Sequence, residues 1–196
     1  IDQKLRQQPY YKSLIKVEPK IGAKRYIELV HSPDYVKRVK EEIESGVHYL
    51  DSMDTAVCKR SYEVALLAVG GSLNMCDAII SGEAIRGFCA ARPPGHHAEY
   101  DYAAGFCIFN NIAIAAKYLQ VEHGINKIAI VDWDVHHGNG SQHTFEGDRT
   151  VLYISTHQYP HFPGTGARSE RGKGEGEGYT LNFPMPAGSG DPEYMD

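Results

Sequence analysis

The pattern of hydrophobic positions predicts three long helices. Residues 62–80 keep helical spacing on one apolar face, with Gly82 as the stop: Tyr62, Leu66, Val69, Leu73, Cys76 and Ile80. A second helix is predicted after His31, because Ser32 is a good N-cap and Pro33 suits the first helical position. A third is expected from Asn111 to His123, closed by Gly124.

Short apolar runs between these helices predict strands. Arg86–Ala91 reads as a short buried strand, Ile128–Val131 as a fully apolar β-branched strand, and Val151–Ser155 as the next one. Strands and helices alternate at the spacing of βαβ units, which predicts an α/β protein whose parallel sheet is flanked by helices on both faces. No internal repeat or low-complexity linker interrupts the chain.

The chemistry-bearing residues follow two of the predicted strands. His96 and His97 are adjacent on a Pro/Gly turn, while Asp132, Asp134 and His136 recur at a spacing of two after Ile128–Val131. Asp and His at that spacing can hold a cation such as zinc, and neighbouring histidines can move protons beside it. The alternative is an Asp/His network that merely ends a strand. Because all these features occur in one chain, we favour a metal-dependent hydrolase.

Four stretches in this order carry a family resemblance: Arg92–Glu99, Gly105–Asn111, Val131–Gly140 and Phe162–Gly166. They resemble the histone deacetylase superfamily, in the branch of class II enzymes and bacterial deacetylase-like amidohydrolases, over the range from about His31 to Tyr194. The resemblance implies an arginase/deacetylase-like fold and a single partial catalytic domain over residues 1–196, incomplete at both ends. The family's third zinc ligand, a later Asp, and its catalytic Tyr have no counterpart in the chain.

The resemblance also implies the metal sites. Asp134 and His136 would be two zinc ligands. Two potassium sites are expected as well, formed mostly by backbone carbonyls: one with Asp132, Asp134, His136, Ser155 and Thr156, and one with Phe145, Asp148, Val151 and Tyr179.

In the same comparison His96 and His97 handle protons. Asp132 would lie behind His96 and favour its charged form, whereas Asn139 would lie behind His97. A neutral amide cannot stabilise an imidazolium by charge, so we expect His97 to be the less basic of the two and to act as the general base.

The comparison further assigns a substrate channel. Phe106 and Phe162 would form the walls of a narrow acyl-lysine channel, and Gly105 would let the backbone approach the substrate amide. Ordinary core packing is the alternative for both aromatic residues.

Other histidines and a glycine-rich stretch are given structural interpretations. His157 and His161 are expected to be loop or rim residues, and His31, His48, His123 and His143 to be structural or exposed. Lys173–Gly178 lacks a phosphate-loop pattern and is predicted to be a mobile loop near the site.

Composition narrows the class of protein. A net charge of −5 over 196 residues argues against nucleic-acid binding and weakly favours cationic substrates. No signal-peptide pattern and no run of about 18 apolar residues is found, so we expect neither secretion nor membrane binding. The four cysteines lack C-x-x-C spacing and read as reduced, mostly buried thiols of a cytoplasmic protein.

The sequence therefore predicts zinc-dependent hydrolysis of the amide of acyl-lysine, through a His-His pair and a metal-activated water. Two alternatives stay open: an acetylpolyamine deacetylase, acting on an acetylated small amine, and a catalytically inactive fragment. We also expect possible self-association, through sheet surfaces that the missing strands would cover.

Overall fold

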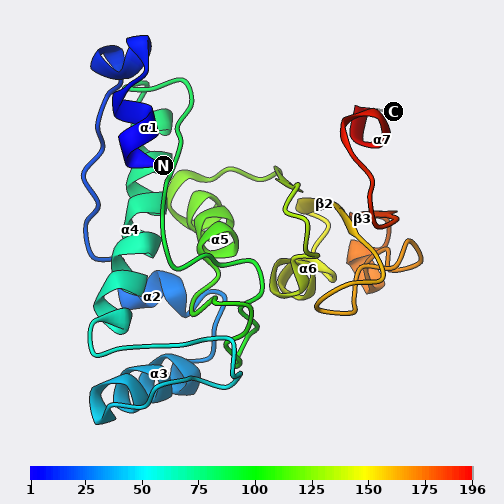
Figure 1. Ribbon diagram of the computed structural model, residues 1–196, viewed down its shortest axis with the longest axis horizontal. Coiled ribbons are helices and arrows are strands. Elements are labelled where there is room, and N and C mark those ends of the chain that lie inside the picture. Colours follow the sequence, from blue (N-terminus) through cyan, green and yellow to red (C-terminus); the bar gives the residue numbers. More distant parts are fainter. Residues whose placement is uncertain (196) are drawn as a thin grey trace.

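The computed structural model describes residues 1–195. Figure 1 shows the helices α2 to α5 gathered on one side and the strands with α6 on the other. In chain order the elements are α1 (Asp2–Arg6), a 3-10 helix (Pro9–Ser13), α2 (Lys24–Ile27), α3 (Pro33–Ser45), α4 (Ser61–Ile80), α5 (Asn111–His123), β1 (Ile128–Asp132), α6 (Asn139–Phe145), β2 (Val151–Gln158), a second 3-10 helix (Gly174–Gly176), β3 (Thr180–Met185) and α7 (Asp191–Met195).

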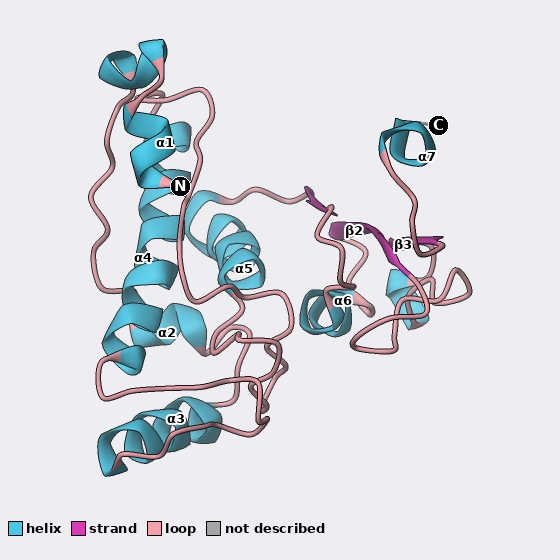
Figure 2. Ribbon diagram, viewed as in Figure 1, coloured by secondary structure: helices cyan, strands magenta, loops and turns pink. Residues whose placement is uncertain are grey.

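The strands form one parallel sheet in the order β1-β2-β3 (Figure 2), which confirms the predicted α/β class. Asp132, the last residue of β1, pairs with Ser155 within β2, and Ser155 pairs with Asn182 within β3, so three polar residues lie side by side across the sheet. Along β2 every second residue is buried, and α6 packs against this strand. The carboxyl edge of a parallel sheet is where α/β proteins commonly place their ligands.

One strand prediction is wrong, and one strand of the structure was not predicted. Arg86–Ala91 is not a strand: it runs as exposed chain along α4, where Gly87 lies against the Met75 side chain. The segment therefore runs beside a helix instead of entering the sheet, and its Phe88 side chain is 68% exposed. Conversely, the sequence pattern does not predict β3, because Pro184 cannot donate a ladder hydrogen bond and usually argues against a strand. The proline is tolerated because β3 pairs with only one strand, β2, within the described residues.

The start of α3 at Ser32 and the end of α5 at Gly124 follow the predicted caps, whereas the Asn110 cap of α5 was not predicted. The Ser32 hydroxyl accepts the Tyr35 N–H at 3.0 Å and starts α3. Asn110 caps α5 by accepting the Ala113 N–H at 3.2 Å, and Gly124 ends that helix in the left-handed conformation with φ 65°. The start of α3 and both ends of α5 thus lie where local capping chemistry places them.

The apolar core lies mainly among the helices α2 to α5 and extends to the strands. Tyr35 is fully buried at its centre, and its hydroxyl donates to the Ile108 carbonyl at 2.7 Å. Helix α4 contributes the predicted face only in part, since Val69 and Leu73 are buried but Ile80 is 45% exposed. Buried residues that extend this core to the sheet are Phe109, Ala113, Ile114, Ile130, Phe145, Val151 and Tyr153.

Helix α4 is long and apolar enough to cross a membrane by length and composition alone. It is the one such helix in the part of the chain that the structure describes. A core helix has the same composition, and α4 packs against α3 and α5, so this pattern is weak evidence for a membrane span.

Candidate active site

The loop after β1 places the carboxylates through consecutive turns. Asp132 Oδ1 accepts the Asp134 N–H at 3.1 Å, and Asp134 Oδ1 accepts the His136 N–H at 2.8 Å. Such Asp side chains bend the backbone after themselves. The strand therefore ends at Asp132, and the D-x-D-x-H spacing is displayed by turns rather than by a continuing strand as expected.

The His96 ring is held by the end of β1. Its Nδ1 lies 2.9 Å from Asp132 Oδ2, which also accepts the Tyr153 hydroxyl at 3.2 Å. Burial raises the pKa of the Asp132 carboxyl, but the hydrogen bonds from His96, Asp134 and Tyr153 outweigh that effect and hold the pKa below its ordinary value. Asp132 is therefore ionised at neutral pH and lies behind His96, as the sequence predicts.

The His97 ring is held by α6. Its Nδ1 lies 2.8 Å from Asn139 Oδ1, and both side chains are buried. Burial, together with the adjacent His96 ring 4.0 Å away, lowers the pKa of His97 to about 4. A neutral ring whose Nδ1 donates to Asn139 keeps its Nε2 free to accept a proton.

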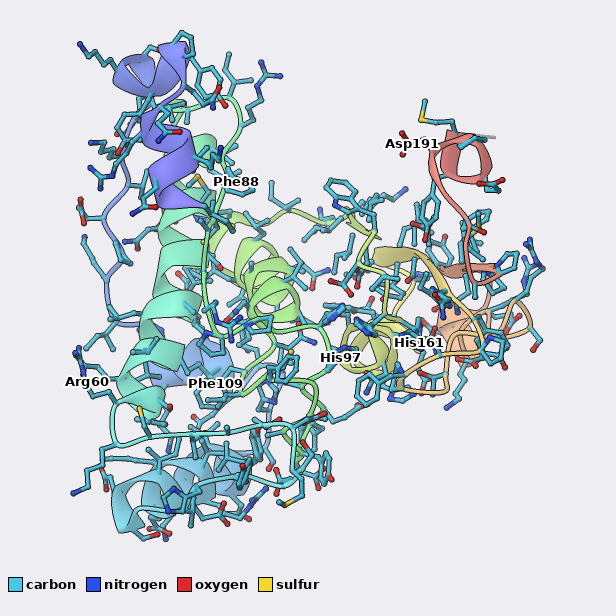
Figure 3. The ribbon with its side chains drawn as sticks, in the orientation of Figure 1. Arg60, Phe88, His97, Phe109, His161 and Asp191 are labelled. Atoms are coloured by element: carbon cyan, nitrogen blue, oxygen red, sulfur yellow. The ribbon has the colours of Figure 1, made fainter. Side chains whose placement is uncertain are left out.

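A pocket of about 320 Å³ gathers most of the predicted residues. Phe162 forms one wall and meets the His97 ring edge to face, with centroids 5.0 Å apart. Figure 3 shows His97 and His161 near each other, at the junction of the helices and the sheet. The lining residues are Asp54, Pro94, His96, His97, Gly105, Phe106, Asp134, His136 and Phe162.

The backbone at Gly105 and Phe106 is unusual. Both residues have positive φ, 57° and 65°, and a side chain seldom adopts this region without a compensating reason. A Cβ on Gly105 would lie 2.1 Å from Cδ2 of His97, so only glycine fits here. In this structure Gly105 thus lets the backbone approach the His97 ring closely. Its predicted approach to a substrate amide stays a prediction. The turn leaves Phe106 58% exposed at the pocket.

Two of the predicted metal donors face each other. His136 Nδ1 lies 3.1 Å from Asp134 Oδ1, and both side chains are partly exposed to the pocket. Two donors at this separation can contact one cation at the 2.0–2.2 Å typical of zinc. Among residues 1–195, however, no group of three His, Cys, Asp or Glu side chains is arranged to hold a metal ion. The described donors thus fit part of a zinc site.

Two residues of the first expected potassium site lie beside each other, because the register of β1 and β2 pairs Asp132 with Ser155. For the second, the Phe145 and Asp148 carbonyls accept the N–H groups of Asp148 and Val151, respectively, in the turn between α6 and β2. The Asp148 carboxylate accepts a hydrogen bond from Lys117 Nζ at 2.6 Å through Oδ2. Potassium at either place stays a prediction.

The fold places three further residues at or near the site. Asp54, which no sequence pattern indicates, accepts the Gly105 N–H at 3.1 Å through Oδ1 and lines the pocket. His161 stacks on His136, with centroids 5.1 Å apart, as a rim residue. His157 is not a loop residue, contrary to expectation: it is fully buried in β2, with its ring between Ser155 Oγ and the Gly166 carbonyl. Only the fold reveals these neighbours.

One further expectation stays a prediction and another needs correction. The glycine-rich stretch Lys173–Gly178 contacts the residue that follows α6, since Lys173 N–H donates to the Glu146 carbonyl and Gly176 is buried, and its predicted mobility stays a prediction. The cysteines are not mostly buried: Cys58 and Cys89 are exposed. Cys107 is buried, and burial raises the pKa of its thiol to about 12, so it stays protonated.

A parallel sheet with paired histidines at its carboxyl edge, each held by a side-chain acceptor, is typical of an α/β hydrolytic domain. The sequence model of the histone deacetylase domain matches residues 1–196, and the chain belongs to that family of hydrolases.

Individual relatives agree with this assignment. A probable deacetylase of Archaeoglobus fulgidus is 42% identical over 97% of this chain and 53% of its own length. The polyamine deacetylase HDAC10 of Homo sapiens is 37% identical over 98% of this chain and 30% of its own. The crystal structure of the HDA15 HD domain is similar with a TM-score of 0.83, at 40% identity, and covers 87% of this chain and 48% of that chain. The chain thus spans about half the length of the first relative.

Proposed function

We propose that the protein containing this chain removes acyl groups from acylated lysine by zinc-dependent amide hydrolysis. The observation that carries the proposal is the pocket that His96, His97, Asp134 and His136 line together with the aromatic residues Phe106 and Phe162. Asp134 and His136 would hold the zinc ion, together with donors outside the described set. When bound, zinc would polarise the acyl carbonyl and acidify a water molecule.

The proton steps belong to the two histidines. His97 Nε2 accepts the proton of the attacking water, because its Nδ1 is occupied by Asn139 at 2.8 Å. His96, held by the ionised Asp132, returns a proton to the leaving amine. This division of labour follows from which acceptor lies behind each ring.

The aromatic walls suit a long alkyl stem. Phe106 and Phe162 are 58% and 42% exposed and both line the pocket. Two rings at such an entrance can exclude water from a lysine side chain while its amide reaches the histidines.

A second candidate substrate is an acetylated polyamine. The similarity to a polyamine deacetylase and the acidic Asp54 at the pocket favour this alternative. The test is turnover of an acetyl-lysine peptide and of N-acetylspermidine by the full-length protein. A higher kcat/KM on the peptide supports the proposal, and a higher value on N-acetylspermidine supports the alternative. No turnover of either would contradict deacetylation.

A further inference from the structure

A chain of hydrogen bonds continues behind His97. Asn139 accepts from His97 Nδ1 at 2.8 Å, and its own amide nitrogen donates to Glu99 Oε1. The other partner of the Glu99 carboxylate is His143, whose Nδ1 lies 2.9 and 3.0 Å from the two carboxylate oxygens. The Glu99 carboxylate is thus linked to the His97 ring through two successive hydrogen bonds.

The ionisation of Glu99 sets the direction of these bonds. Burial raises the pKa of its carboxyl, but hydrogen bonds from His143 and Asn139 outweigh this and lower the pKa below its ordinary value. An ionised carboxylate can only accept hydrogen bonds. Asn139 must therefore turn its NH₂ group to Glu99 and its oxygen to His97.

The orientation of this amide decides the tautomer of His97. The oxygen and nitrogen ends of an amide have nearly the same shape, so hydrogen-bond partners determine which way it points. If the NH₂ group of Asn139 faced His97, then Nδ1 would have to accept and the proton would move to Nε2. A ring with its proton on Nε2 cannot take a proton from water at that atom.

We propose that Glu99 is a positioning residue that keeps the His97 proton on Nδ1 by fixing the orientation of Asn139. The proposal rests on the proposed role of His97 as the base. The backbone of Glu99 is itself held by two hydrogen bonds, since its carbonyl accepts from His31 Nδ1 at 2.7 Å and its N–H donates to the Tyr102 carbonyl at 2.9 Å.

The first test is Glu99→Ala in the full-length, zinc-loaded protein. We expect kcat on an acetyl-lysine peptide to fall about 10-fold or more, as for loss of a hydrogen bond to a charged group, with KM nearly unchanged. The ¹⁵N resonances of the His97 ring should shift from the Nδ1–H tautomer towards the Nε2–H tautomer. Glu41→Ala is the matched control, because it removes a carboxylate that pairs with Lys37 at 3.8 Å on the exposed side of α3, outside this network.

The second test separates positioning from folding. Asn139→Asp alone places two carboxylates in contact and should lower kcat. When Asn139→Asp is combined with Glu99→Ala, the introduced carboxylate would accept from His97 Nδ1 without help, so kcat should recover above that of either single variant. Glu99→Gln keeps the side-chain size but offers either end of an amide to Asn139, and should give an intermediate kcat.

The outcomes are distinct. An unchanged His97 tautomer in Glu99→Ala, or a double variant no better than the single ones, would overturn the role of Glu99. Because the tautomer is read from the spectrum, this result does not depend on turnover. If the wild-type protein hydrolyses neither substrate but Glu99→Ala still changes the His97 tautomer, the proposed function is overturned and the positioning role stays intact.

Discussion

At the scale of single residues, the site separates groups that would bind metal from groups that orient a ring. Asp134 and His136 face each other at 3.1 Å, whereas Asp132 is directed at His96. Two carboxylates only two positions apart in the sequence therefore have different partners. The turns that follow Asp132 and Asp134 produce this difference.

This separation predicts how metal content responds to mutation. In the full-length protein, Asp134→Ala or His136→Ala should abolish zinc binding, because each removes a direct donor. Asp132→Asn should retain zinc but lose turnover, since an amide cannot supply the charge that the His96 ring requires. Elemental analysis beside a turnover assay checks this, and equal metal loss in all three variants would contradict the assignment.

Gly105 offers a second test at a single residue. Gly105→Ala should lower both stability and kcat, because the new Cβ would lie 2.1 Å from the His97 ring. Gly124→Ala is a matched control, with a similar positive φ of 65° and nothing within 4 Å of its Cβ. The control should lose only about 1–2 kcal/mol of unfolding free energy from backbone strain, with kcat unchanged. Equal kcat in the two variants would show that contact with His97 is unimportant.

At the scale of elements, His31 links three segments. It follows α2, its Nδ1 donates to the Glu99 carbonyl at 2.7 Å, and its Nε2 accepts the Asn110 N–H at 2.9 Å where α5 begins. Both ring nitrogens are thus committed in a neutral imidazole. Burial lowers the pKa of His31 to about 4 from its ordinary 6.5.

The lowered pKa predicts a pH dependence of stability. Above pH 6.5 His31 is unprotonated in both the folded and the unfolded state, so it does not change the free energy of unfolding. Between pH 6.5 and about 4 the unfolded chain binds a proton that the folded protein excludes, so the free energy of unfolding falls with falling pH. The loss from this residue levels off below pH 4 at about 3 kcal/mol.

Urea titrations of the full-length protein at several pH values measure this effect. His31→Gln keeps a donor and an acceptor but does not titrate, so its stability should fall less steeply between pH 6.5 and 4 than that of the wild type. The comparison isolates His31 from other buried histidines whose pKa is lowered, such as His137. Parallel curves for the two proteins would contradict the prediction.

The elements also show where sequence reasoning succeeds. The helix α5 is predictable from Asn111 to Gly124 because caps are local signals, and β1 because an apolar β-branched run has few alternatives. Arg86–Ala91 has a similar apolar run, but whether such a run joins a sheet depends on a neighbouring strand. That neighbour is a property of the fold, as is the tolerance of Pro184 in β3.

The same limit applies to the site. His96, His97, Asp134 and His136 can be found from their spacing and family resemblance, because metal and proton chemistry restricts which residues occur. Glu99 lies two hydrogen bonds behind His97, and its partner Asn139 is 40 residues away in the sequence. A glutamate that acts through a second side chain leaves no pattern of its own.

At the scale of the whole molecule, the described part of the sheet has an open side. β1 pairs only with β2 among residues 1–195, and Val131 and Trp133 beside it are 52% and 78% exposed. An unpaired strand edge with apolar neighbours is prone to pair with another chain.

The isolated 196-residue chain should therefore self-associate and show little or no deacetylase activity. Two described donors leave zinc without the three protein ligands usual in catalytic sites. Sedimentation and a turnover assay with an acetyl-lysine peptide and added zinc, on the same sample, check both expectations. Robust activity from a monomeric chain would contradict them.

The central claim is that His97 is the base of a deacetylase site, and His97→Ala in the full-length protein tests it most directly. The account predicts that kcat on an acetyl-lysine peptide falls about 10²–10⁴-fold while KM changes little, because the base acts in the transition state. His48→Ala, at an exposed histidine away from the pocket, should keep wild-type turnover. Near-wild-type kcat in folded, zinc-loaded His97→Ala would contradict the account.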